Sequence, residues 1–215
     1  MSEEENKKPE ENKKPDEQQG LDIQGHIKIF DPETDEVHVD KKNAIHYQNF
    51  SVALAKSIAN RTTGFIEEMH FGNGGTAVDT TGAITYLTPN AKGDNANLYN
   101  KTYYKSINDQ SALNTDTARN KITVAHTNGT TYTDLIVTCL LDFGEPAGQQ
   151  AFDNTTTVND TYVFDELGLF SWEGTAGSGK LLTHVIFHPV QKSLNRLIQI
   201  DYTIRIQSLT NFVDV

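Results

Sequence analysis

The sequence of 215 residues contains a single cysteine, Cys139, and lacks an apolar run of the length that spans a membrane. One cysteine cannot form an intramolecular disulfide, and the N-terminus has no apolar region of the kind found in secretion signals. A membrane-spanning helix needs about 20 predominantly apolar residues. We therefore expect a protein that is made in a cytoplasm and has no membrane partner.

Positive charge is also scarce, since 18 basic residues stand against 29 acidic residues and the formal net charge is −11. A nucleic-acid-binding surface needs clustered lysine and arginine side chains that displace counterions from the phosphates. The most basic stretch holds lysine pairs at 7–8 and 13–14, and glutamates are interleaved with them. Nucleic acid is therefore excluded as an expected partner.

The first twenty residues contain almost no hydrophobic side chain. They repeat the hexapeptide EENKKP at 4–9 and 10–15, and its prolines oppose a helix. A segment that cannot bury apolar surface is disordered in isolation. We expect residues 1–20 to be a disordered acidic and lysine-rich arm, either a solubilising tail or an arm that orders against a partner subunit.

From residue 21 onward, apolar and polar residues alternate with a period of two, which is typical of half-buried strands. The abundant Thr, Asn and Gly favour short strands joined by many turns. Turns are expected at 31–36, 72–75, 128–129 and 174–179, and a loop at 144–160. The expected strands are 21–29, 37–39, 65–71, 83–87, 122–124, 135–143, 162–172, 181–188 and 198–206.

One short helix is expected from apolar residues at helical spacing: Phe50, Ala53, Leu54 and Ile58. Asn49 or Ser51 is expected to cap its start, and Gly64 lies where it should stop. The pattern predicts a mainly β fold, an antiparallel β-sandwich or partly open barrel with one short helix and the disordered N-terminal arm.

Residues 21–215 are expected to form a single antiparallel β domain with a polar insertion around 88–120. That insertion is too long for a structureless loop inside a compact domain. We expect it to hold a short strand around Tyr103–Ile107 or to project outward.

Two motifs resemble functional sites but lack a required part. Residues 174–180, GTAGSGK, match a phosphate-binding loop, but Leu181 replaces the Ser or Thr that holds magnesium and a strand is expected to follow. The spacing of Asp31, Glu33 and Asp35 matches the start of a calcium loop without its glycine at the sixth position. Both motifs are therefore interpreted as turns.

Other residues with reactive side chains also lack a partner at a useful spacing. His184 and His188 lie four apart on an expected strand, roughly 13 Å at about 3.3 Å per residue, which is too far to share one zinc ion. They are interpreted as surface or edge histidines. Cys139 lies in an apolar stretch that predicts core packing. Asp165 and Glu166 are adjacent, so in a strand they should face opposite sides and cannot act as a carboxylate pair.

The sequence therefore predicts no catalytic, cofactor-binding or metal-binding residues, no cofactor, no small-molecule ligand and no enzymatic activity.

Several segments recur in a fixed order along 21–215. They are FDPET at 30–34, KKNAIH at 41–46, FGNGG at 71–75, FDELGLF at 164–170, LLTHVIF at 181–187, and a closing FHP at 187–189 with Lys192 and IDYTI at 200–204. In this order the set resembles the tail, collar and fibre-attachment proteins of tailed bacteriophages. Asp35 stands where such proteins commonly have a glycine, and Asp tolerates the left-handed backbone conformation better than most residues.

The resemblance implies a structural component of a tailed phage virion, at the neck, tail or baseplate, made in the host cytoplasm. Its implied partners are other virion proteins and copies of itself, as a homo-oligomer held through sheet edges and extended arms. Two alternatives stay open. One is a capsid decoration or head-fibre protein, and the other is a host-surface glycan-binding module that uses the tyrosines of 88–120.

Overall fold

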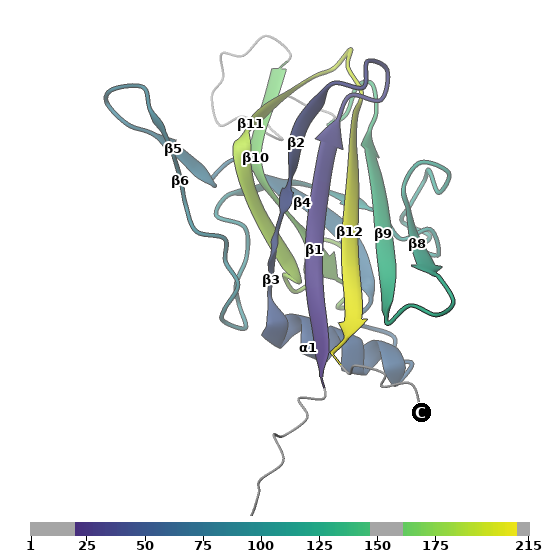
Figure 1. The fold of residues 1–215 in the computed structure, drawn as a ribbon. Helices are drawn as coiled ribbons and strands as arrows, with labels where there is room; N and C mark the ends of the chain where they lie inside the picture. Colours follow the sequence, from purple (N-terminus) through teal and green to yellow (C-terminus); the bar gives the residue numbers. More distant parts are fainter. Residues whose placement is uncertain (1–19, 147–160, 210–215) are drawn as a thin grey trace, which may run out of the picture.

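The computed structural model describes residues 20–146 and 161–209, which form two antiparallel five-stranded sheets facing each other as a sandwich (Figure 1). The expectation of a mainly β, antiparallel fold is confirmed. The expected arm at 1–20 lies outside the described residues except for Gly20, and the expected loop at 144–160 lies outside them from 147 onward.

The first sheet has the order β2 (Val37–Lys42), β1 (Leu21–Phe30), β12 (Ile198–Ser208), β9 (Tyr132–Leu141) and β8 (Lys121–His126). The second sheet has the order β3 (Ala44–Ile45), β11 (Thr183–Ser193), β10 (Thr161–Ser171), β4 (Ile66–Gly72) and β7 (Lys101–Ser106). The chain crosses from the first sheet to the second between β2 and β3. This short crossing brings the two sheets together along one side.

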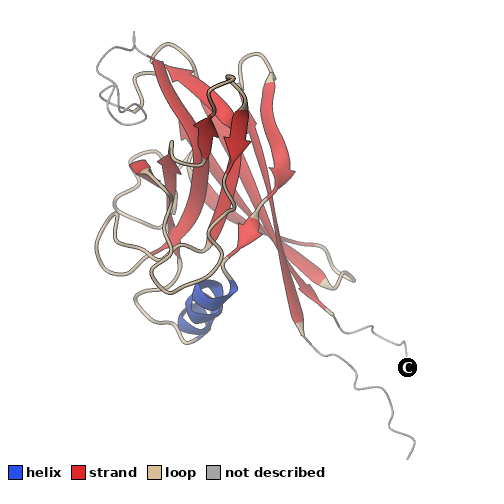
Figure 2. Cartoon of the chain, turned by 90° about the vertical axis from the view of Figure 1, so that its left-hand side faces the viewer, coloured by secondary structure: helices blue, strands red, loops and turns tan. Residues whose placement is uncertain are grey.

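Two further elements lie outside the sheets. Helix α1 (Tyr47–Ile58) crosses one end of the sandwich, as Figures 1 and 2 show from two directions. Strands β5 (Thr76–Val78) and β6 (Ile84–Tyr86) pair as a hairpin that projects from the side (Figure 1). Among the described residues, no helix has the length and apolarity that a membrane crossing requires.

The main core lies between the sheets and follows the alternation in the sequence. Along β12, Ile198, Ile200, Tyr202 and Ile204 are buried, while the residues between them are partly exposed. The second sheet contributes a facing set of core residues: Met69, Phe71, Phe164, Leu167, Leu169, Val185 and Phe187. Burial of one such aliphatic or aromatic side chain stabilises the fold by about 1.5–3 kcal/mol.

The helix lies where the sequence predicts it, but both of its ends differ from the prediction. His46 is the N-cap, because its side chain accepts a hydrogen bond from the backbone N–H of Asn49, so the predicted cap at Asn49 or Ser51 is wrong. The helix ends at Ile58, before the predicted stop at Gly64, and Asn60, with φ of 49°, has the left-handed conformation that follows the helix. Ile58 itself is 79% exposed, so it does not belong to the buried face.

Two strand boundaries also differ. Strand β9 ends at Leu141, and Phe143 lies in the following turn with its side chain half exposed, not on the core face of the strand. Strand β11 begins at Thr183 and continues to Ser193, beyond the expected end at His188.

The polar insertion around 88–120 holds a strand, as predicted. This strand, β7, pairs with β4 at the edge of the second sheet. The residues before it, Thr88–Asn100, do not project outward but lie against the outer face of the second sheet, where Leu98 packs with Phe170 and Leu181. We call Thr88–Asn100 the covering segment.

Candidate functional site

The outer face of the second sheet carries a group of buried titratable side chains, and we call four of them the carboxylate–histidine layer. Glu68 and His70 come from β4, Glu166 from β10 and His184 from β11. Glu68, His70 and His184 alternate with core residues along their strands, so they face away from the main core. None of their side chains is more than 2% exposed.

Glu166 is the centre of this layer. Its Oε1 accepts hydrogen bonds from the backbone N–H groups of Gly74 at 3.1 Å and Asn100 at 2.8 Å. Its Oε2 accepts from the N–H of Tyr99 at 2.9 Å and from Nε2 of His184 at 3.0 Å. Burial acts to raise the pKa of this carboxyl, but the donors from His184, Asn100 and Tyr99 outweigh burial, and the pKa lies below its usual range.

Asp165 reaches the same loop as Glu166. Its two oxygens accept hydrogen bonds from the N–H groups of Gly75 and Thr76, both at 2.9 Å, and from the Thr76 hydroxyl. Burial raises the pKa of Asp165, and the charge of Glu166 adds to this effect.

The prediction that Asp165 and Glu166 face opposite sides of a strand is therefore wrong. The pairing of β10 with β11 shifts register between Phe164 and Glu166, and the flanking core residues Phe164 and Leu167 are three positions apart. Such an irregularity breaks the strict alternation of a strand. Both carboxylates consequently leave the core on the same side.

Glycines at positions 72, 74 and 75 allow this loop to approach the carboxylates. A Cβ atom at Gly72 would lie 2.6 Å from Oε1 of Glu166, and one at Gly75 would lie 2.9 Å from Ile186. The sequence predicts a turn here, and the structure adds that its amides bind a buried anionic side chain.

His184 lies under the covering segment, so its interpretation as a surface or edge histidine is wrong. Its Nδ1 accepts a hydrogen bond from the backbone N–H of Asn90 at 2.8 Å. Because an amide N–H can only donate, Nδ1 carries no proton, and Nε2 carries the proton that is donated to Glu166. His188, in contrast, is exposed and contacts the Tyr86 hydroxyl at 3.3 Å.

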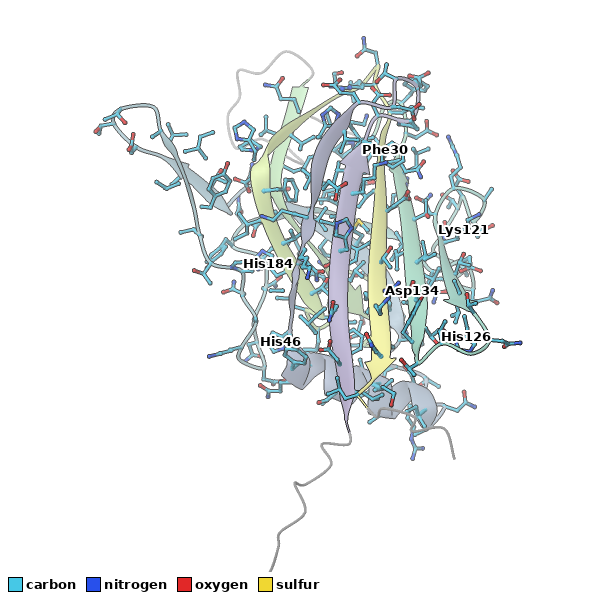
Figure 3. All side chains as sticks on the ribbon, viewed as in Figure 1. Phe30, His46, Lys121, His126, Asp134 and His184 are labelled. Atoms are coloured by element: carbon cyan, nitrogen blue, oxygen red, sulfur yellow. The ribbon has the colours of Figure 1, made fainter. Side chains whose placement is uncertain are left out.

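His46, which follows β3 and precedes α1, binds the same segment, and Figure 3 labels both histidines. Its Nδ1 accepts the Asn49 N–H at 3.2 Å, and its Nε2 lies 2.9 Å from the carbonyl oxygen of Gly93. The same reasoning fixes its neutral tautomer, with the proton on Nε2. Two buried histidines thus hold the covering segment three residues apart, at Asn90 and Gly93.

Glu68 and His70 hold the turn that follows β10. Glu68 accepts the Gly177 N–H at 2.8 and 3.1 Å and lies 2.7 Å from Nε2 of His70, whose ring stacks on Phe170. Burial lowers the pKa of His70, and its bond to Glu68 opposes this only in part. The segment that matched a phosphate-binding loop is therefore a turn, as predicted, whose amide binds a side-chain carboxylate.

The other residues singled out from the sequence lie in a turn or in the core. Asp31 accepts hydrogen bonds from the N–H groups of Glu33 and Thr34, and Asp35 has φ of 59°, as expected for a turn. Burial raises the pKa of Cys139 to about 12, which keeps its thiol protonated. Within 20–146 and 161–209, no three His, Cys, Asp or Glu side chains come together as metal ligands.

A separate apolar groove of about 400 Å³ opens between α1 and the ends of both sheets. Helix α1 contributes Phe50, Ala53 and Leu54 to its lining, and β12 contributes Ile204 and Ile206. A lining of this kind favours apolar groups over polar substrates.

In the described residues, the layer has the chemistry of a structural clasp. The carboxylate oxygens of the layer accept hydrogen bonds from backbone amides and from histidines. Because its side chains are at most 2% exposed, a substrate cannot reach them while the covering segment is in place. Sequence reasoning missed the clasp because its acceptors and donors are far apart along the chain. The one available signal was the set of acidic and histidine residues at alternating strand positions opposite aromatic and aliphatic ones.

Comparisons of this chain with protein-family models, with curated proteins and with solved structures found no match.

Proposed function

We propose that this chain is a structural component of a tailed phage particle, which acts by binding copies of itself and neighbouring virion proteins at the neck, tail or baseplate. The ordered segments that resemble such proteins motivate the proposal. The observation that carries it is the open edge of the first sheet at β8.

Strand β8 pairs with β9 on one side and ends the first sheet on the other. All of its residues are exposed except Ile122, and the apolar side chain of Val124 is 67% exposed. An unpaired edge offers backbone N–H and C=O groups to a strand of another chain. In Figure 1, β8 lies on the side of the sandwich opposite the β5–β6 hairpin. The N–H of Ile122 already donates to Oδ1 of Asp109 at 3.2 Å, so a neighbouring strand would pair with the rest of β8.

The buried layer supports the same proposal. Its charged side chains fix loops onto the second sheet, and a rigid outer surface suits a protein that repeats by symmetry. The acceptors of Glu166 are fully engaged by protein donors, which leaves this carboxylate without a free lone pair for a substrate.

The direct test is to purify phage particles whose genome encodes this chain and to detect the chain in them by mass spectrometry. Gold-labelled antibody and electron microscopy then locate it in the particle. Labelling at the neck, tail or baseplate supports the proposal, and labelling of the head favours a capsid decoration or head-fibre role. Absence from particles, together with abundance in the lysate, contradicts a virion role.

The edge itself is tested with Val124→Lys, because a lysine on an edge strand disfavours pairing with a second strand. Sedimentation velocity should show self-association weakened at least about tenfold, or ~1.4 kcal/mol. Val78→Lys is the matched control, since Val78 is 68% exposed and lies on the projecting hairpin. Equal association of the two variants would remove β8 from the proposed interface.

A host-surface glycan-binding module is the second candidate. Tyr86, Tyr99 and Tyr104 are exposed on or near the covering segment, and exposed aromatic rings can stack on sugars. A glycan array distinguishes the two roles, because specific binding that is lost on Tyr→Ala substitution would favour the module.

A further inference from the structure

Two hydrogen bonds at or near the covering segment exist only when a histidine Nδ1 carries no proton. Nδ1 of His184 accepts the Asn90 N–H at 2.8 Å, and Nδ1 of His46 accepts the Asn49 N–H at 3.2 Å. A proton added to either Nδ1 would point at an amide hydrogen that cannot accept it. Protonation therefore breaks both bonds, while the bonds made by Nε2 are kept.

The two losses have different consequences. At His184 the lost donor is Asn90, so the start of the covering segment loses this bond to the sheet. At His46 the lost donor belongs to α1, so the helix loses its N-cap while the bond from Nε2 to Gly93 remains. His184 is thus the residue whose protonation acts on the covering segment directly.

The groups that face His184 come from three neighbouring elements. From β10, the Glu166 carboxylate lies 3.0 Å from Nε2 and would form an ion pair with the imidazolium. From the covering segment, the Tyr99 ring lies 5.9 Å from the imidazole, centroid to centroid, and β3 places the apolar Ala44 opposite His184. Asp165 adds a second negative charge beside Glu166. When Nδ1 gains a proton, the Asn90 amide is the group that must move.

We propose that His184 is a proton-sensitive latch, which holds the covering segment against the second sheet at neutral pH and releases its Asn90 end in mild acid. The sign follows from the bonds. The closed form needs an imidazole whose Nδ1 carries no proton, so a falling pH disfavours it and a rising pH favours it. Release loosens the part of the segment around Asn90, because Tyr99 and Asn100 still donate to Glu166 and Gly93 still accepts from His46. This inference does not depend on the virion role.

Hydrogen–deuterium exchange of the full chain at pH 7.5 and pH 5.5, corrected for the intrinsic pH dependence of exchange, tests the latch. Peptides within 88–100 should exchange at least tenfold faster at pH 5.5, whereas peptides of β12 should keep their protection. Unchanged exchange in 88–100 overturns the proposal, and so does an equal acceleration of every peptide, because the release would then not be local.

His184→Asn provides the matched test, because the Asn oxygen can accept the Asn90 N–H without titrating. Its 88–100 peptides should show the same corrected exchange at both pH values. His188→Asn is the control on the same strand, since exposed His188 makes no bond to the covering segment in the structure, and it should keep the full acid response. A response that persists in His184→Asn overturns the proposal. If that variant does not fold, the wild-type exchange decides alone.

Discussion

Glu166→Gln is the substitution that tests the buried clasp most severely. The side chain keeps its size, but one acceptor oxygen becomes an NH₂ group. Each oxygen of Glu166 accepts two hydrogen bonds, so in either orientation of the Gln amide its NH₂ group would face two N–H donors. Hydrogen bonds to a charged group contribute about 1.5–3 kcal/mol each, so the loss of two should lower the free energy of unfolding by about 3 kcal/mol or more.

Urea denaturation followed by tryptophan fluorescence measures this loss, because Trp172 is the single tryptophan and lies at the end of β10. Glu33→Gln serves as the control, since Glu33 is exposed on a turn and should change the free energy of unfolding by less than about 0.5 kcal/mol. A cost below about 1 kcal/mol for Glu166→Gln would refute the argument that this carboxylate organises the loops.

The same substitution has a pH signature. The pKa of Glu166 is lowered in the folded chain, so its ionised form stabilises the fold above the ordinary value of 4.5, and this stability is lost as the pH falls through the lowered pKa. The difference in the free energy of unfolding between the wild type and Glu166→Gln should therefore shrink below about pH 4.5. A difference that stays constant to pH 3 would contradict the assigned ionisation.

Three further outcomes are expected. Gly168→Ala should lower the free energy of unfolding by about 1–3 kcal/mol in urea titrations, because its Cβ would lie 2.3 Å from the carbonyl oxygen of Thr183; an unchanged midpoint would contradict this. Cys139 should not react with a thiol reagent at pH 8 until urea unfolds the chain, since it is buried and its pKa is raised to about 12; rapid native reaction would show an exposed thiol. His46→Ala should cost about 1 kcal/mol, seen as a lower Tm, whereas His46→Asn should retain the helix cap and most of the stability.

The sequence predicts the first sheet and the main core well, because that sheet obeys a simple alternation. In β12, Ile200, Tyr202 and Ile204 are buried as the period of two requires. The sequence also predicts the left-handed turn at Asp35 and the burial of Cys139, because each depends on residues that are close in the sequence.

The second sheet was harder to predict because both of its faces are covered. Glu68, His70 and His184 occupy the alternate positions that, in a simple sandwich, face water. What covers them is the segment 88–100 and the turn 173–180, and no local pattern shows where such segments dock. The register shift beside Asp165 is similarly invisible, because it depends on pairing with β11. The polar residues of these strands therefore predict a sheet face that is exposed to solvent, whereas in the structure that face is buried and forms the clasp.

The measurement that bears most directly on the proposed role is the number of copies of this chain per purified phage particle. Quantitative mass spectrometry against a known capsid protein gives that ratio. A structural component should be present in a fixed copy number that matches a ring or a symmetric set of positions and that survives repeated gradient purification. A ratio that falls towards zero with each purification step would contradict the account.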